Sequence, residues 1–210
     1  MISKPIHWLY KMALNKSYIQ SIGLVLLLSL TVLLNGCKTI VGASTDEPIQ
    51  VDPGKRLLGT YINDERVETI AEVNIDKAHP DLKKANVNVT LFNGVALLTG
   101  QVADEELRRL AAETVNEIDY VRQVHNELQI QGNISLLSQT NDTWLVNKVK
   151  TKLLTHKDVE GNRVKIIAED GTIYLMGLVS RIEAEKITEL VSATPGVQQV
   201  VRVFEYIDVN

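Results

Sequence analysis

Two stretches of the chain repeat one pattern, NVTLFNGVALLTGQV at residues 88–102 and KIIAEDGTIYLMGLV at residues 165–179. In each stretch, two β-rich runs flank a two-residue turn, Asn93-Gly94 in the first and Asp170-Gly171 in the second. These dipeptides tolerate the positive φ angles that a type I′ hairpin requires. Each stretch therefore predicts a β-hairpin, and the repeat predicts two copies of one module.

The segments around each hairpin follow a common order. A helix is expected before each hairpin, and a second helix and a last strand after it, from the spacing of apolar residues. In the first copy these segments are a helix at about 64–78, a helix at 104–118 and a strand at 121–130; in the second they are a helix from Asn141 or Asp142, either a good N-cap, to about 156, a helix at 180–193 and a strand at 197–207. The predicted fold class is α+β, with two tandem α-β-β-α-β modules, each a small three-stranded mixed sheet covered by two helices.

The first 36 residues predict an export signal, because they hold three lysines, no acidic residue and a nearly all-apolar run at 19–34. The run ends in Leu34-Asn35-Gly36-Cys37, which resembles the bacterial lipobox. This resemblance implies that Cys37 carries a diacylglycerol and, on its amine, a further acyl chain such as palmitate. By resemblance to Gram-negative sorting signals, Lys38 favours the outer membrane, with the soluble part facing the periplasm. The alternative is an uncleaved membrane anchor with an incidental cysteine.

Composition divides the chain into five predicted parts. They are a signal peptide at 1–36, the lipidated cysteine and a flexible tether at 37–59, a first module at 60–131, a linker at 132–140 and a second module at 141–210. Of 22 basic and 26 acidic side chains, three lysines precede Cys37, so the remainder has 19 basic against 26 acidic groups, a net charge of −7. This acidic balance argues against nucleic acid as a partner.

The sequence shows no catalytic pattern. Cys37 is the only cysteine, and the three histidines that follow it, His79, His125 and His156, share no spacing. Nucleophile-elbow, zinc-protease, P-loop and dinucleotide motifs are missing from the sequence. We therefore expect no enzymatic activity, no cofactor and no metal site.

The first helix of the second module carries a tryptophan away from its predicted core face. At about 100° per residue, Val146, Val149 and Leu153 form one stripe, and Trp144 falls about 160° from Val146. With Val67 of the first copy aligned to Val146, the positions of Trp144, Lys148 and Lys152 are held there by Glu65, Thr69 and Val73. The two copies are thus expected to share a core face and to differ on the outer face.

An outward Trp144 beside Lys148 and Lys152 suits a membrane interface. Indole prefers the headgroup region, and lysine stems can lie along the apolar layer while their ammonium groups meet lipid phosphates. Lys150 is expected to project toward the core edge and is not included. The alternative is that Trp144 packs against the other module or the linker.

The duplicated hairpin–glycine–helix pattern resembles the BON domain, a family of bacterial envelope modules. Its most specific stretches are Asn141-Asp142-Thr143-Trp144, residues 170–179 and Pro195-Gly196-Val197. With the lipobox, the whole chain resembles dual-BON outer-membrane lipoproteins, in which the corresponding helix is implied in contact with anionic phospholipid. Carried over, this resemblance implies lipid contact by Trp144 and Leu154, and the charge argument adds Lys148 and Lys152.

The resemblance implies a non-catalytic outer-membrane lipoprotein that binds anionic phospholipid through this helix. It also implies a role in envelope integrity, with enrichment at the division site. The alternative function is a periplasmic interaction module that acts on outer-membrane assembly machinery or on regulators of cell-wall hydrolysis.

Overall fold

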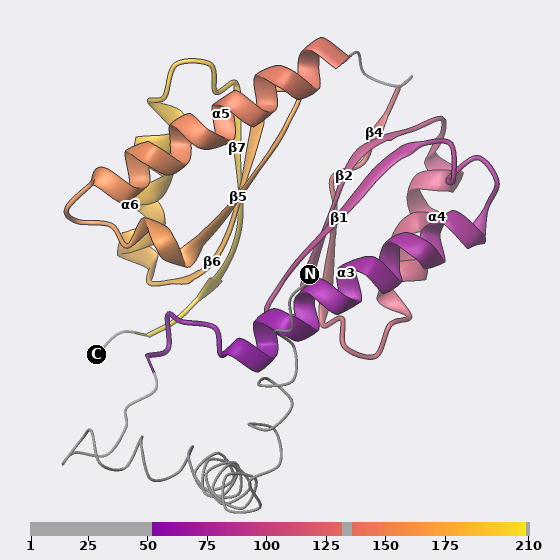
Figure 1. The fold of residues 1–210 in the computed structure, drawn as a ribbon, viewed down its shortest axis with the longest axis horizontal. Helices are drawn as coiled ribbons and strands as arrows, with labels where there is room; N and C mark the ends of the chain where they lie inside the picture. The colour runs from indigo at the N-terminus through magenta and orange to yellow at the C-terminus, as the bar shows by residue number, and fades with distance from the viewer. Residues whose placement is uncertain (1–51, 132–135, 209–210) are drawn as a thin grey trace, which may run out of the picture. The chain divides into compact units, whose positions relative to one another are not determined.

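The computed structural model describes residues 52–131 and 136–208, and for residues 136–140 it describes only the backbone. The predicted signal peptide, Cys37 and most of the predicted tether lie outside the described residues. Within them the chain forms two α/β modules in the order expected from the repeat (Figure 1). None of the described helices is both long and apolar enough to cross a membrane.

Each module places a hairpin between two helices and ends in a parallel strand. The first consists of α3 (Leu58–Ala78), β1 (Asn86–Phe92), β2 (Val95–Val102), α4 (Glu105–Asn116), β3 (Gln123–Asn126) and β4 (Gln129–Ile130). The second consists of α5 (Leu136–Thr155), a 3₁₀ turn η1 (Gly161–Arg163), β5 (Val164–Glu169), β6 (Thr172–Val179), α6 (Arg181–Ser192) and β7 (Gln199–Tyr206). The hairpin strands pair antiparallel, and the last strand joins the second hairpin strand in parallel. The predicted α+β fold class is confirmed.

The last strand of the first module is interrupted, so that its sheet has four strands where three were expected. β3 ends at Asn126, whose side chain accepts a hydrogen bond from the Leu128 N–H (3.3 Å) and donates one to the Arg108 carbonyl (2.8 Å). Leu128 is thereby buried in the core, and β4 then resumes parallel pairing with β2.

Both hairpin turns have the predicted type I′ conformation, with φ angles of 53° and 75° at Asn93-Gly94 and of 47° and 75° at Asp170-Gly171. A buried aspartate from the preceding helix holds each turn. Asp64 accepts hydrogen bonds from the N–H groups of Asn93 (2.8 Å) and Gly94 (3.0 Å). Asp142 accepts the equivalent bonds from Asp170 (2.8 Å) and Gly171 (2.9 Å).

This use of the aspartates corrects the predicted helix starts. α3 begins at Leu58, six residues before the predicted start at about 64, and α5 begins at Leu136, five or six residues before the predicted start at Asn141 or Asp142. Asp142 is therefore not an N-cap, because it lies inside α5 with its carboxylate committed to the hairpin turn. The helical segment also enters the stretch that was predicted to be a linker.

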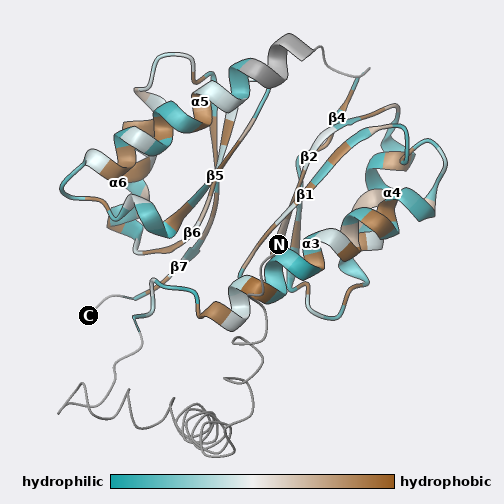
Figure 2. Ribbon diagram, viewed as in Figure 1, coloured by the Kyte–Doolittle hydropathy of each residue, from teal (hydrophilic) through white to brown (hydrophobic). Residues whose placement is uncertain are grey.

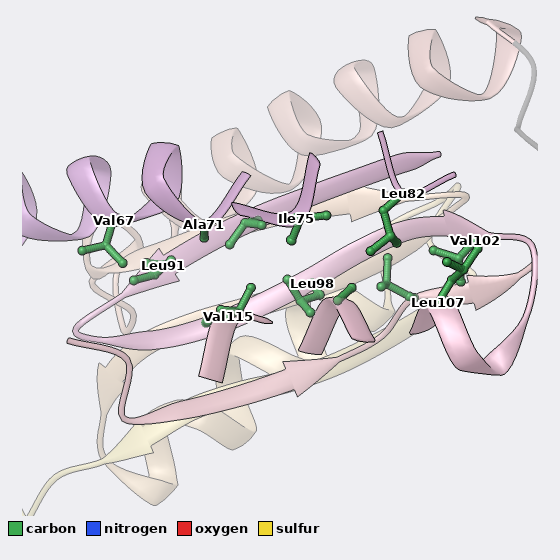
Figure 3. Packing of buried hydrophobic residues seen from close by; sticks show 13 residues of the cluster. Val67, Ala71, Ile75, Leu82, Leu91, Leu98, Val102, Leu107 and Val115 are labelled. Carbon is green, nitrogen blue, oxygen red and sulfur yellow. The ribbon is translucent and has the colours of Figure 1, made fainter. Parts of the chain in front are cut away.

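The core of each module lies between its helices and one face of its sheet. Figure 3 shows Val67, Ala71 and Ile75 of α3 packed over Leu91 and Leu98 of the sheet. On α5 the buried apolar stripe is Leu145, Val149 and Leu153. Val146 was predicted to lie in this stripe, but it is only partly buried, because the stripe runs one residue earlier in its first turn.

The other faces of the two sheets contribute to one further apolar cluster. Its buried members are Phe92, Val95, Leu97, Tyr174, Met176 and Val203. This explains why every residue of β2 is buried, since the strand has apolar neighbours on both faces.

Candidate functional site

The outer face of α5 presents two large apolar side chains to solvent. Trp144 is 55% exposed and Leu154 is 53% exposed. Asn147 and Thr151 lie between them and are also exposed, so the stripe opposite the core runs from Trp144 to Leu154. This is the face on which the sequence placed the indole.

Trp144 is held in place by residues of its own module. The Lys148 ammonium lies 4.4 Å from the centre of the indole ring, in a cation–π arrangement. The ring edge lies against Gly196, where an added Cβ would come within 3.7 Å of the indole Cζ3 and 3.3 Å of Leu145 Cδ1. Gly196 also has a φ of +103°, a conformation that favours glycine. The indole is therefore ordered while half of its surface stays open to solvent.

The two predicted lysines also have a structural task. Lys148 Nζ donates a hydrogen bond to the Pro195 carbonyl (2.8 Å), and Lys152 Nζ donates to the Leu190 carbonyl (2.7 Å) and to Thr194 Oγ1 (3.2 Å). These acceptors lie in and just beyond the last turn of α6, which has no basic residue of its own in that turn. Cations from α5 thus satisfy carbonyls at the negative end of the α6 dipole.

A shallow groove of about 550 Å³ runs between α5 and the segment that follows α6. It is lined by Trp144, Asn147, Lys148, Thr151, Lys152, Thr194 and Pro195. An ammonium has three donors, so Lys148 keeps two after its bond to Pro195. The groove therefore combines an apolar ring with cationic donors at an open surface.

Lys150 lies on the other flank of α5 from this groove, where it lines a second hollow with Val146, Val164 and Ile166. Its side chain is exposed, and it makes no hydrogen bond or ion pair with any residue that the structure describes. Lys150 lies one helical turn before Leu154, on the other flank of the outer face from Lys152.

The first module lacks an equivalent surface. The aspartates at 64 and 142 set the correspondence between α3 and α5, so that Arg66, Ile70 and Asn74 stand where Trp144, Lys148 and Lys152 do. The predicted counterparts Glu65, Thr69 and Val73 are therefore wrong by one residue. Tyr120 stands where the second module has Gly196, and its hydroxyl donates to Asp64 (3.0 Å).

Two of the histidines have local roles in the backbone of turns. His79 Nδ1 accepts a hydrogen bond from the Asp81 N–H (3.2 Å), and His156 Nδ1 accepts one from the Asp158 N–H (3.3 Å). Across residues 52–131 and 136–208, no group of three or more His, Cys, Asp and Glu side chains has the arrangement of a metal site.

Comparison with known proteins shows which family and which proteins the chain is similar to. The BON domain family model matches residues 63–132 and 141–208. The chain is 33% identical over 187 residues to "Outer membrane lipoprotein DolP" of Haemophilus influenzae, which covers 88% of this chain and 96% of that protein. It is 31% identical to the "21 kDa hemolysin" of Actinobacillus pleuropneumoniae, over 77% of this chain and 82% of that protein.

A solved C-terminal domain of CdsD, a structural protein of the Chlamydia trachomatis type III secretion system, aligns over 69% of this chain and 67% of that one at 16% identity, with a TM-score of only 0.28.

Proposed function

Because the chain belongs to the BON-domain family and carries two such domains, we propose that it is a non-catalytic outer-membrane lipoprotein that binds anionic phospholipid through the outer face of α5. Its relation to an outer-membrane lipoprotein supports the location, and BON domains are not a catalytic family. The proposed lipid-binding residues are Trp144, Leu154, Lys148 and Lys152, and the exposed Lys150 is added to them.

The observation that carries this proposal is the half-exposed indole of Trp144 beneath the Lys148 ammonium. An indole is stable where its ring meets an apolar layer and its N–H stays wet, which is the condition at the level of lipid headgroups. Leu154 adds a second apolar side chain on the same face. A surface of this composition fits a bilayer better than it fits water.

The cationic flanks supply the preference for anionic lipid. Each lysine near an anionic surface contributes about 1 kcal/mol, so Lys148, Lys150 and Lys152 together give weak binding. The chain after Cys37 has a net charge of −7, and attraction must therefore come from this local cluster. A lipid anchor at Cys37 would raise the effective concentration of the α5 face at the membrane, so that weak contacts suffice.

The proposed anchor and setting follow the sequence prediction. Cys37, within its lipobox-like stretch, would take the acyl chains, and Lys38 would direct the protein to the outer membrane with its modules in the periplasm. In this setting a lipid-binding module can respond to places where anionic phospholipid concentrates. The proposed role is support of envelope integrity, with enrichment at the division site.

Vesicle binding tests the proposal. The chain from residue 38 onward is sedimented with vesicles of neutral lipid and with vesicles that contain phosphatidylglycerol, at low and high salt. We expect stronger binding to anionic vesicles, weakened by salt, and a lower affinity for anionic vesicles in Trp144→Ala. Trp144 is the only tryptophan after Cys37, so its emission should shift to the blue as the indole enters the lipid. Ile182→Ala is the matched control, because Ile182 is an exposed apolar residue (70%) on α6 of the same module.

Two results would contradict the proposal. Equal binding to both vesicle types would contradict the anionic preference, and an unchanged affinity of Trp144→Ala for anionic vesicles would contradict the role of the α5 face. If the chain ignores vesicles but binds purified outer-membrane assembly components or regulators of cell-wall hydrolysis, the alternative function replaces this one.

A further inference from the structure

The start of α3 exposes large apolar side chains that the fold of the first module does not use. Leu57, Leu58, Tyr61 and Ile62 are 62%, 74%, 47% and 56% exposed, and we call them the α3 patch. Figure 2 shows the hydrophobic colouring at this end of the helix. Four large apolar side chains within six residues are unusual at a protein surface that meets only water.

The patch lies outside the core stripe of its helix. That stripe consists of Asp64, Val67, Ala71 and Ile75, and it begins after the patch ends. Leu58 and Ile62 are one turn apart, and at about 100° per residue they project roughly opposite the core stripe. Their exposure therefore follows from the register of the helix and does not come from a local distortion.

Arg56 links the α3 patch to the buried part of the first module. The Arg56 guanidinium lies 5.3 Å from the centre of the Tyr61 ring and 3.9 Å from that of Phe92, and it pairs with the buried Asp64 carboxylate at 2.6 Å. The Tyr61 N–H donates to the Leu57 carbonyl (3.1 Å). The apolar side chains are thus presented by an ordered helical turn that is tied to the core.

Position in the chain indicates what covers the patch. Leu57 follows Cys37 by 20 residues, a span of at most about 70 Å when fully extended and much less as a flexible chain. If Cys37 carries the lipid anchor, the patch is the first apolar surface of the described chain to come within reach of the membrane. Tyrosine beside aliphatic residues is typical of the interfacial layer of a bilayer.

Most charged groups around the α3 patch are paired with a group of opposite sign. Within residues 55–66 the exposed charged side chains are Lys55, Glu65 and Arg66, which sum to one positive charge. The hollow lined by Leu58 and Tyr61 also holds the exposed Lys150, and three further cations there, Arg56, Arg163 and Lys165, are each paired with a carboxylate. Lys55 is in turn 3.5 Å from the Asp52 carboxylate. The chemistry of this surface is therefore apolar, in contrast to the lysine-flanked face of α5.

We propose that the α3 patch inserts into the interfacial layer of the bilayer and gives the first module its own lipid contact. This contact goes beyond binding by α5 and does not depend on it. Because it is driven by apolar burial, it occurs on neutral as well as anionic lipid and changes little with salt.

The test uses the chain from residue 38 onward with Trp144→Ala, which removes the α5 contact, and vesicles of neutral phosphatidylcholine. We expect salt-insensitive binding that falls at least about tenfold in Leu58→Glu/Ile62→Glu, because two apolar side chains are lost and two charges are added. The control is Ile130→Glu/Ile182→Glu, which adds the same charge at two other exposed isoleucines (51% and 70%) and should stay within about twofold. Thermal unfolding of both variants establishes that they are folded.

A second readout locates the contact. In a Trp144→Phe background, Tyr61→Trp places the only tryptophan of the chain from residue 38 in the α3 patch. Its emission should shift to the blue with neutral vesicles. Absence of both the shift and the binding would overturn the proposal, as would equal losses in the two glutamate pairs.

The competing occupant is a second copy of the chain. Sedimentation velocity without vesicles distinguishes the two cases. If the parent chain is a dimer that Leu58→Glu/Ile62→Glu converts to a monomer while vesicle binding is unchanged, the α3 patch is a self-association surface and the proposal fails. Failure here leaves the α5 hypothesis intact, because the latter is judged by the anionic preference of the chain with Trp144 present.

Discussion

Separate replacement of Lys152 and Lys150 by glutamine should distinguish packing from lipid binding on α5. Lys152 Nζ is bonded to the Leu190 carbonyl (2.7 Å) and to Thr194 Oγ1 (3.2 Å), whereas Lys150 is exposed and belongs to the open face. Buried hydrogen bonds from a charged group contribute about 1.5–3 kcal/mol each. Lys152 is only partly buried, and the amide of glutamine can replace part of the contact. We therefore expect Lys152→Gln to lower the free energy of unfolding by about 1–2 kcal/mol.

Lys150→Gln should lower the affinity for anionic vesicles and leave the free energy of unfolding nearly unchanged. Loss of one charge at an anionic surface costs about 1 kcal/mol, which is about a fivefold loss in affinity for anionic vesicles at low salt. The free energy of unfolding should stay within about 0.5 kcal/mol of the parent, because an exposed side chain without a partner stabilises little. The two variants remove the same charge from the same helix and thus serve as controls for each other.

Two measurements test the separate roles expected for Lys152 and Lys150. Urea unfolding followed by Trp144 fluorescence reports on the second module directly, and co-sedimentation with phosphatidylglycerol vesicles at two salt concentrations reports on affinity. An unchanged unfolding curve for Lys152→Gln would refute the role of this lysine at the end of α6. Unchanged vesicle binding for Lys150→Gln would refute its place in the lipid-binding surface.

Two further predictions concern stability. Asp142→Ala leaves the N–H groups of Asp170 and Gly171 without their carboxylate acceptor, so urea unfolding should show a loss of about 2–4 kcal/mol, and a loss below about 1 kcal/mol would contradict the proposed hold on the hairpin. Burial raises the pKa of Tyr174 to about 12, whereas an unfolded tyrosine titrates near pH 10, so this residue contributes stability that is complete below pH 10 and is lost as the pH rises toward 12. Relative to Tyr174→Phe, the parent should lose up to about 3 kcal/mol between pH 9 and pH 12 in urea titrations, and parallel curves for the two proteins would show that the phenol is not desolvated.

The hairpins were predictable because their information is local. A dipeptide that tolerates positive φ fixes the turn, and the turn fixes the strand register, as the pairs Phe92–Val95 and Glu169–Thr172 show. The helix starts were not, because the strongest local signal was misleading. Asp142 has the chemistry of an N-cap, but its carboxylate is used by a turn 28 residues later, a tertiary contact that local sequence does not reveal.

That tertiary contact also had a signal in the sequence. Asp64 precedes its turn residue Asn93 by 29 positions, and Asp142 precedes Asp170 by 28, so the repeat contains the aspartate as well as the hairpin. Alignment on the aspartates would have matched Val67 to Leu145 and corrected the core stripe. The prediction that Trp144 points outward survived this error. Shifting the core stripe by one residue rotates it by about 100°, and Trp144 still lies on the solvent side of the helix.

The contacts of the lysines needed the packed structure. Their acceptors lie at the end of α6, about 40 residues further along the chain, and only the packing of α5 against α6 brings them together. Charge and spacing alone suggested free ammonium groups at the surface. The structure instead shows Lys148 and Lys152 bonded to acceptors near the end of α6, whereas Lys150 makes no hydrogen bond or ion pair with a described residue.

Two linked differences explain how one fold presents two surfaces. The second module has Trp144 and Gly196 where the first has Arg66 and Tyr120, and a Cβ added at 196 would lie 3.7 Å from the indole edge, in van der Waals contact with it. The indole of Trp144 packs against its own module on two sides, with the positive-φ Gly196 at its edge and the Lys148 ammonium over its ring. In the first module Tyr120 instead donates to Asp64, and the open apolar side chains lie at the start of α3. The two proposals thus assign a salt-sensitive surface to the second copy and an apolar surface to the first, and the salt dependence of vesicle binding should separate them.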